Sequence, residues 1–288
     1  MGRIEEQDDN PVARLISSGT PSAIGKIGGV EGKCLEFMAF PSIYRRLRPD
    51  KARRLTKMLY DLAGGYPQRT RTLEEFADYW RLHVLPNVDI LSNWRGAKDE
   101  LIKRRYNAPA TLIPVKLFDL IKRPSWPSAL NHKRVLVVSP FKHSILSQRE
   151  KLADIWKGTF HLDNVDLVDV VAPPVHAHLI PPRTPNWFVQ LGAIWSEMQR
   201  HEYDVVLIGA GAWGLPLAVL AKSAGKVGIH TGGVTQLLFG VMGKRWSEHG
   251  EPDYMNENWI YPDERDVPPN LHLAPKAFRD DATYWRTS

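Results

Sequence analysis

Residues 203–214 read YDVVLIGAGAWG, an apolar run rich in β-branched residues that ends in glycines. The uninterrupted core of this run, VVLI, is typical of a strand that is covered on both faces of a parallel sheet. Gly209, Gly211 and Gly214 complete a GxGxxG pattern directly after it, and residues 215–224 then have the apolar spacing of a helix. A strand, a glycine turn and a helix in this order predict part of a βαβ unit.

Further short β-branched runs lie on both sides of this stretch. They occupy residues 22–28, 110–115, 134–141, 165–174 and 226–233. Between the later runs, residues 148–156 and 186–200 also have helical patterns. Strands that alternate with helices imply right-handed crossovers. We therefore predict an α/β fold, with a Rossmann-like, mostly parallel sheet and helices on both of its faces.

The first third of the chain is predicted to be mainly helical. A helix is predicted over residues 11–18. Asn10 would cap it, Pro11 would be its first residue, and Gly19 would end it. Further helices are predicted over residues 30–40, 50–63 and 72–92. The last of these would open with a capping box formed by Thr72 and Glu75 and would kink or split at Pro86. We expect one domain over residues 1–262, with a helix-rich insertion at about 41–108, and a tail over 263–288 that wraps over the domain.

Composition excludes several classes of protein. With 43% hydrophobic and 24% charged residues, the 288-residue chain is predicted to fold, and no window of about 18 apolar residues indicates a membrane span. The acidic start, MGRIEEQDDN, does not have the pattern of a signal peptide, so we expect a soluble, cytoplasmic protein. The single cysteine, Cys34, excludes a disulfide framework and predicts a buried, inert thiol rather than a nucleophile.

The net charge of +6 is too small to indicate nucleic-acid binding. It is nevertheless concentrated, because residues 45–57 hold seven basic residues against one acid. A solvated helix face is one interpretation of this stretch. Peripheral attraction to anionic lipid, or to a lipid-linked phosphate acceptor, is the other.

The glycines of residues 209–214 allow the backbone to approach a phosphate, which helix amides would bind. Tight packing of the strand on its helix is the alternative. A dinucleotide site also needs an acid at the end of the next strand, but that strand ends in His230-Thr-Gly232-Gly233. We therefore expect no NAD(P). The chain also has no G-x-S-x-G, Walker or H-E-x-x-H motif, which argues against the common hydrolase, nucleotide-triphosphatase and metalloprotease classes.

Other turns follow the ends of predicted strands, at residues 139–143, 172–176 and 230–233. Ligands bind outside the carboxyl ends of strands in open parallel sheets, so these turns should line one crevice. Ordinary capped loops are the alternative interpretation. His176 and His178 form an H-x-H pair that could ligate zinc, but no third ligand lies near them in the sequence. Lys244 and Arg245 could neutralise a diphosphate, or could end a helix in solvent.

Several stretches together resemble a bacterial polysaccharide-biosynthesis family with the GT-D type of glycosyltransferase fold. The matching text lies between about residues 20 and 262 and comprises IGKIGGVEG, VLVVSPF, VVAPPVHAHLIPPRTPNWF, DVVLIGAGAWGLPLAVLAKSAGK, IHTGGVTQLLFGVMGKRW and NENWIYP. This resemblance implies a nucleotide-sugar-dependent glycosyltransferase. The family carries an Asp-x-Glu element that serves Mn²⁺ or Mg²⁺ and the donor. Glu31 matches its glutamate, and Gly29 stands in place of its aspartate.

The resulting prediction is transfer of a sugar from a nucleotide-diphosphate-sugar donor to a glycan or lipid-linked acceptor. Glu31 would be the catalytic base, or a metal ligand that lacks its partner aspartate. The donor would contact Gly28, Gly29, Ser139, Phe141, His143, His176, Trp187, Gly209, Gly211, Gly214, His230, Gly232, Gly233, Gln236, Lys244 and Arg245. A non-catalytic sugar-nucleotide-binding protein and, with less support, an NAD(P)-dependent oxidoreductase are the alternatives.

Overall fold

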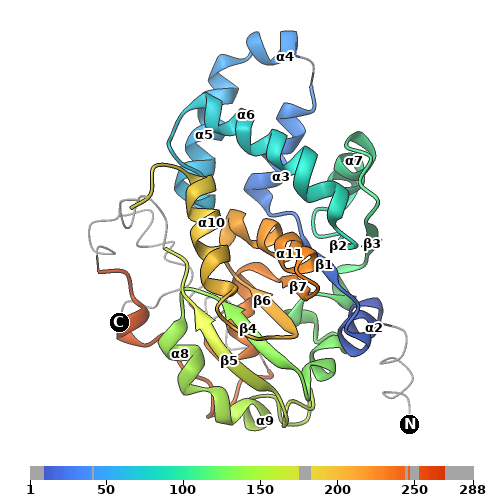
Figure 1. The fold of residues 1–288 in the computed structure, drawn as a ribbon, viewed down its shortest axis with the longest axis vertical. Coiled ribbons are helices and arrows are strands. Elements are labelled where there is room, and N and C mark those ends of the chain that lie inside the picture. The colour runs from blue at the N-terminus through green and yellow to red at the C-terminus, as the bar shows by residue number, and fades with distance from the viewer. Residues whose placement is uncertain (1–9, 41, 175–182, 244–245, 247–252, 270–288) are drawn as a thin grey trace.

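The computed structural model describes residues 10–40, 42–174, 183–243, 246 and 253–269. At its centre lies a seven-stranded sheet in which all neighbouring strands run parallel (Figure 1). The order across the sheet is β3-β2-β1-β7-β6-β4-β5. The strands are β1 (Ser22–Lys26), β2 (Ile90–Ser92), β3 (Thr111–Ile113), β4 (Arg134–Val138), β5 (Asp166–Val171), β6 (Val205–Ile208) and β7 (Val227–His230).

The central strands are buried on both faces, as their continuous apolar sequences predict. Successive side chains of a strand point to opposite faces. Val206 and Ile208 accordingly join one hydrophobic core, while Val205 and Leu207 join the other. The predicted α/β fold with a parallel, Rossmann-like sheet is therefore confirmed.

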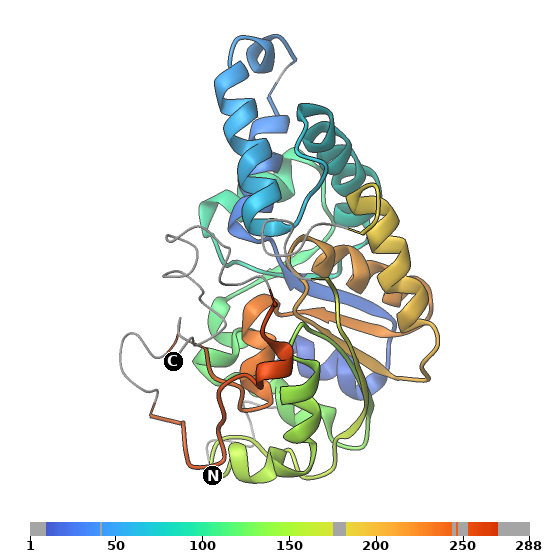
Figure 2. The same ribbon diagram turned by 90° about the vertical axis from the view of Figure 1, so that its left-hand side faces the viewer.

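Helices supply the rest of both cores. The first core receives side chains from α3 (Gly29–Met38), α5 (Pro49–Ala63), α6 (Thr70–Tyr79), α7 (Ala97–Arg105), α10 (Trp187–Met198) and α11 (Gly214–Ser223). The second receives them from α2 (Pro11–Ser18), α8 (Lys142–Ser147), α9 (Leu152–Ile155) and α12 (Thr235–Leu238). The remaining helix, α4 (Ser42–Arg46), lies beyond α3 and α5, at the far end of the molecule's long axis (Figures 1 and 2). Within the described ranges, no helix has the length and apolar character needed to cross a bilayer.

Two sequence predictions near the N-terminus are confirmed. The side chain of Asn10 caps α2 by accepting a hydrogen bond from the amide of Val12, and Gly19 ends the helix in the left-handed conformation with φ +65°. Cys34 is a free, buried thiol in α3, and burial raises its pKa. These features follow from local sequence, which is why they could be predicted.

The helix predicted over residues 72–92, with a kink or split at Pro86, is only partly correct. α6 begins at Thr70 after the cap residue Arg69, so Thr72 is not a cap but a buried residue of the first turn. After α6 the chain continues as a π-helix (Trp80–Val84) and a 3-10 helix (Leu85–Asn87). Pro86 lies in that 3-10 helix, and its ring and missing amide hydrogen prevent continuation of the α-helix. Residues 90–92 are then β2, paired with β1.

The helix predicted over residues 148–156 is also only partly correct. That region holds a 3-10 helix (Arg149–Lys151) and the short α9, and it is preceded by α8, which was not predicted. The N-terminus of α8 is capped from far along the chain. Asp266 accepts hydrogen bonds from the amides of His143 and Ser144, at 2.9 and 2.7 Å. Local patterns cannot reveal a cap that comes from 122 residues away.

The segment 253–269 packs on the sheet domain. Ile260 forms a parallel bridge with Val241, and the indole of Trp259 is buried in the second core. A 3-10 helix (Glu264–Asp266) then brings Asp266 to α8. The segment thus contacts both α8, which follows the loop after β4, and the chain beyond α12, which follows the loop after β7.

Other connecting segments contain further short helices. They include 3-10 helices over Val115–Leu117, Leu120–Lys122, Trp126–Leu130, Gly211–Trp213 and Gly232–Val234. The last two lie directly after β6 and β7, where they shape the backbone of the site described next.

Candidate functional site

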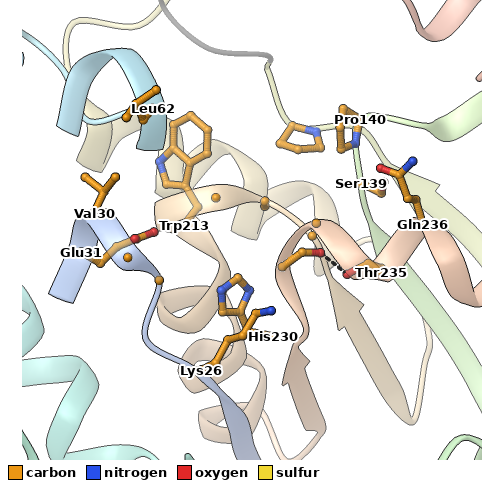
Figure 3. Close-up of a pocket in the computed structure, with 18 of the residues that line it drawn as sticks. Lys26, Val30, Glu31, Leu62, Ser139, Pro140, Trp213, His230, Thr235 and Gln236 are labelled. Atoms are coloured by element: carbon orange, nitrogen blue, oxygen red, sulfur yellow. Dashed lines mark hydrogen bonds between the residues drawn. The ribbon is translucent and has the colours of Figure 1, made fainter. Parts of the chain in front are cut away.

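A pocket of about 400 Å³ opens at the carboxyl ends of the central strands. The loops after β1, β4, β5, β6 and β7 all line it, together with Met58 and Leu62 of α5 and Trp94 after β2 (Figure 3). β4 and β6 are neighbours, yet the chain proceeds from β4 to β5 on one side and from β6 to β7 on the other. Such a reversal is the topological switch point at which ligands bind in open α/β sheets.

Most of the residues that the sequence singled out meet in this pocket. Those that line it are Gly28, Gly29, Glu31, Ser139, Phe141, Gly209, Gly211, His230, Gly232, Gly233 and Gln236. Gly214 lies just behind the wall, against the ring of His230. Glu31 and the glycine turns thus come together although about 180 residues separate them.

Two predicted donor-binding residues lie elsewhere. Trp187 is only 1% exposed and packs behind Trp213, with its ring stacked at 6.5 Å from the ring of Trp213. It is Trp213, not Trp187, that lines the pocket. His143 lies in the first turn of α8, where its amide donates to Asp266, and it does not line the pocket. The positions of His176, His178, Lys244 and Arg245 lie outside the described residues.

Glu31 is buried at the N-terminus of α3, with its side chain turned back over Gly28. A Cβ atom on Gly28 would lie 2.2 Å from Oε2 of Glu31, so any other residue at position 28 would require the carboxylate to shift. Burial raises the pKa of this carboxyl above its ordinary value. Hydrogen bonds from the amides of Glu31 and Val30 and the nearby charges of Arg95 and Lys26 lower it in part.

His230, the last residue of β7, is held as a neutral imidazole. Its Nδ1 lies 3.1 Å from the backbone oxygen of Ile208, and that carbonyl can only accept, so the ring proton is on Nδ1. Burial, together with the charge of Lys26, lowers the pKa of His230 to about 4. Nε2 is therefore left without a proton at neutral pH.

Gly214 leaves room for the imidazole, and Gly25 leaves room for the first atom of the same side chain. A Cβ atom on Gly214 would lie 1.9 Å from Nδ1 of His230, and one on Gly25 would lie 3.0 Å from its Cβ. The third glycine of the GxGxxG pattern therefore serves the packing of α11 against His230. The tight-packing interpretation of the motif holds at this position.

The loops after β6 and β7 each contain a glycine with positive φ. Gly211 has φ +52° and Gly232 has φ +69°. Each follows a residue with negative φ, Ala210 and Thr231, an alternation that turns successive amides toward one side and can cradle an anion. Among the described residues, the amides of Gly211 and Gly232 have no hydrogen-bond acceptor.

Hydrogen bonds hold the loop after β7 in place, and the loop after β6 lies close against it. The Thr235 hydroxyl donates to the backbone oxygen of Gly232 at 2.7 Å (dashed in Figure 3) and lies 2.5 Å from the hydroxyl of Thr231. A Cβ atom on Gly209 would lie 2.9 Å from that same Gly232 oxygen. Gly209 is thus needed for the close contact between the two glycine turns.

Lysines and polar side chains complete the wall. Nζ of Lys26 lies 4.2 Å from the ring centroid of Trp94 and 3.8 Å from Asp119. Gln236 donates through Nε2 to the backbone oxygen of Val241 at 3.1 Å, while its buried Oε1 has no partner within the described part of the chain. Sequence reasoning missed Lys26, although it ends β1, two residues before the glycine turn that was singled out.

Among the described residues that line the pocket, the donor set does not fit a divalent metal. Glu31 is the only carboxylate among the described residues that line the pocket, and Lys26 and Lys33 line it as well. Mn²⁺ and Mg²⁺ need several oxygen ligands, and two ammonium groups repel a cation. The described residues contain no group of three His, Cys, Asp or Glu side chains that could hold a metal.

The pocket thus combines one buried carboxylate, a neutral imidazole, two lysines and two glycine turns at the switch point of the sheet. Its chemistry suits an anionic ligand that also presents hydroxyl groups. Comparison of the chain with family models, with curated proteins and with solved structures found no match.

Proposed function

We propose that this protein is a glycosyltransferase that moves a sugar from a nucleotide-diphosphate-sugar donor to a glycan or lipid-linked acceptor. The observation that carries the proposal is the convergence of one buried carboxylate with two glycine turns in a single pocket. A carboxylate suits the proton transfer, and the turns suit the phosphates. A role in polysaccharide synthesis, and the GT-D type of fold, rest on the sequence resemblance alone.

The glycine turns are the proposed diphosphate site. The amides of Gly211 and Gly232 have no acceptor among the described residues, and an anion would satisfy them. Lys26 ends β1 beside Gly232, since a Cβ atom on that glycine would lie 3.2 Å from Cε of Lys26. Its ammonium group would compensate the charge that develops on the leaving diphosphate.

Glu31 is the proposed base. The acceptor hydroxyl oxygen would form a bond to the anomeric carbon while its proton moves to the Glu31 carboxylate. The bond between that carbon and the diphosphate oxygen would break, and its electron pair would leave with the nucleoside diphosphate. The raised pKa of Glu31 makes its carboxylate a stronger base than an exposed glutamate.

Other lining groups suit the sugar and the base of the donor. The faces of Trp94 and Trp213 are candidates for stacking, because aromatic rings pack against sugars and bases. The buried Oε1 of Gln236 has no partner among the described residues and would accept a hydrogen bond from a donor hydroxyl or base N–H. Nε2 of His230 is a second acceptor in the same wall.

The experiment compares Glu31→Gln with Glu36→Gln. Glu36 lies on the same helix but pairs with Arg95 at 2.9 Å and does not line the pocket. Purified proteins are incubated with UDP-, GDP- and TDP-sugars. The nucleoside diphosphate that is released when the sugar is transferred to water or to an added acceptor is measured. We expect turnover by the wild type and by Glu36→Gln. Glu31→Gln should still bind the donor but lose about 10²-fold or more in turnover.

Two outcomes decide against parts of this proposal. Turnover by Glu31→Gln at the wild-type rate would remove Glu31 from catalysis. Donor binding without product in all three proteins would instead favour a non-catalytic sugar-nucleotide-binding protein, a function that Gly29 in place of the family's aspartate also favours.

A further inference from the structure

The net positive charge of the chain comes from one short segment. Of its 38 basic and 32 acidic residues, seven basic residues and one acid lie between positions 45 and 57. The rest of the chain therefore holds 31 of each sign and is neutral overall. A charge excess confined to 13 residues requires a local explanation.

This segment lies at one end of the molecule. It covers the end of α4 and the first part of α5, which project away from the sheet (Figures 1 and 2). We call residues 42–57 the basic tip. α9 and the connections around it lie at the opposite end.

The basic tip also exposes the two most accessible large apolar side chains of the described residues. Ile43 is 70% exposed and Leu47 is 75% exposed. The amide of Leu47 donates to the backbone oxygen of Ile43 at 3.2 Å, so the two residues are one helical turn apart and share a face. Phe40, three residues before Ile43, is 45% exposed. Exposed apolar side chains that gather in this way mark an interaction surface.

Exposed cations surround these apolar residues. Arg46 precedes Leu47, and Arg48 follows it. One turn into α5, Arg54 is exposed, and neither it nor Arg46 is paired with an acid among the described residues. Arg53 and Lys57 do pair, with Asp50 and Asp61. Long basic side chains beside apolar ones suit the boundary between lipid headgroups and acyl chains.

We propose that the basic tip docks on the surface of an anionic lipid bilayer. Ile43 and Leu47 would enter the headgroup boundary, and Arg46, Arg48 and Arg54 would contact lipid phosphates. The charge of the tip is complementary to anionic lipid, and its combination of apolar and basic residues favours lipid over an acidic protein surface. This docking does not depend on the proposed glycosyltransferase activity.

Docking would also set the position of the pocket. α5 begins in the basic tip and reaches the pocket wall through Met58 and Leu62. Its 15 residues span about 20 Å, so the pocket would stand roughly that far above the lipid surface. A soluble donor could then enter from solvent while a lipid-linked acceptor arrives from the membrane side.

The test is sedimentation of the full chain with vesicles of phosphatidylcholine alone and of phosphatidylcholine mixed with phosphatidylglycerol. The apolar variant is Ile43→Asp with Leu47→Asp. Its control is Leu82→Asp with Leu101→Asp, which makes the same charge change at two exposed leucines outside the basic tip. The charge variant is Arg46→Glu with Arg54→Glu. Its control, Lys151→Glu with Lys157→Glu, makes the same charge change beside α9 at the other end of the molecule.

We expect the wild type to bind the anionic vesicles and not the neutral ones, and added salt to weaken the binding. Both tip variants should bind about tenfold or more weakly, and both controls should bind as the wild type does. Circular dichroism and melting temperature confirm that the variants are folded.

Three results would overturn the proposal. The first is no binding of the wild type to anionic vesicles at low salt. The second is equal loss of binding in the tip variants and in their controls, which would indicate only a general charge effect. The third is a wild-type dimer that becomes a monomer in Ile43→Asp with Leu47→Asp, because the patch would then be a protein interface. Nucleotide-sugar binding is measured separately, so failure of docking leaves the proposed function standing.

Discussion

At the scale of single residues, Gly28 and Glu31 form one unit. Gly28 has φ −62°, a conformation open to any residue, so its backbone does not require glycine. The requirement comes from the carboxylate of Glu31, which occupies the place of a Cβ atom. Gly28 therefore serves the position of the Glu31 carboxylate and not the shape of the backbone.

We predict that Gly28→Ala displaces the Glu31 carboxylate toward solvent and so brings its pKa back toward the ordinary value. Gly29→Ala is the matched control, because a Cβ atom there meets nothing within 4 Å. The pKa of Glu31 in each protein is measured by NMR with ¹³C-labelled glutamate. If the pKa of Glu31 is unchanged in Gly28→Ala, the space left by Gly28 is not what keeps the carboxylate buried and its pKa raised.

His230 makes stability depend on pH. Its folded pKa of about 4 lies below its unfolded value, so between these pH values the unfolded state binds more protons. The free energy of unfolding should therefore fall by up to about 3 kcal/mol as the pH drops from 6.5 to 4. Glu31, whose pKa is raised, contributes with the opposite sign in part of this window.

The His230 contribution is isolated by comparing urea unfolding of the wild type and of His230→Gln at several pH values. We expect the stability difference between the two proteins to shrink as the pH falls. A difference that stays constant from pH 6.5 to 4 would contradict a neutral, buried His230.

Part of the residue-scale account could be predicted from the sequence. The GxGxxG pattern and the His-Thr-Gly-Gly turn identified both turns of the pocket, because ligands bind at the carboxyl ends of parallel strands and both patterns follow apolar strand sequences. The sequence could not show that Gly214 packs against His230. Nor could it show that Trp213, and not Trp187, lines the pocket. Both arrangements depend on which side chains meet across the core.

At the scale of elements, α11 lies directly on β7. A Cβ atom on Gly228 would lie 2.5 Å from the backbone oxygen of Ala218, so helix and strand are in backbone contact. This contact holds the turn after β6 at the edge of the pocket. The same turn carries Gly211 and Trp213.

We predict that Gly228→Ala lowers the free energy of unfolding by about 1–3 kcal/mol through overpacking. Gly192→Ala is the control, because it lies in α10 with open space around its Cβ position and should raise stability by about 0.5–1 kcal/mol. Chemical denaturation measures both changes. If Gly228→Ala has the same free energy of unfolding as the wild type, α11 can move away from β7 at little cost.

The cap of α8 predicts another effect. Asp266→Ala removes the acceptor of two α8 amides and of the Ser144 hydroxyl, and should destabilise the protein by about 1–2 kcal/mol. Asp253→Ala, at an exposed ion pair with Arg123, should change stability by less than about 1 kcal/mol. Equal losses of stability in the two variants would show that the segment 253–269 does not support α8.

Elements with strong local signals were predicted well. β4, β5, β6 and β7 are β-branched runs, and α2 has both a cap and a glycine stop. β2 was missed because the helix predicted over residues 72–92 included it, whereas its pairing with β1 makes it a strand. α8 was missed because its cap comes from Asp266.

At the scale of the whole molecule, the pocket results from the strand order. Five loops from across the sequence meet only because β1, β7, β6, β4 and β5 are neighbours in the sheet. The sequence predicted that strand ends would converge, but strand order depends on long-range pairing. Lys26, Trp94 and Leu62 therefore entered the site only with the structure.

The most direct test of the central claim, that this pocket binds a nucleotide-diphosphate sugar, is a thermal-shift panel on three proteins. These are the wild type, Gly29→Phe, which adds bulk at the pocket wall, and Gly192→Phe, which adds the same bulk on the exposed face of α10. The panel contains UDP-, GDP- and TDP-sugars, NAD(H) and NADP(H), each with and without Mn²⁺.

We predict that one class of sugar nucleotide raises the melting temperature of the wild type and of Gly192→Phe, without need of Mn²⁺, and does not stabilise Gly29→Phe. At a hundredfold excess over Kd the stabilisation should be about 2.7 kcal/mol. Stabilisation of all three proteins would place the ligand elsewhere. Stabilisation by NAD(H) or NADP(H) alone would contradict the account and make the glycine turns a dinucleotide site.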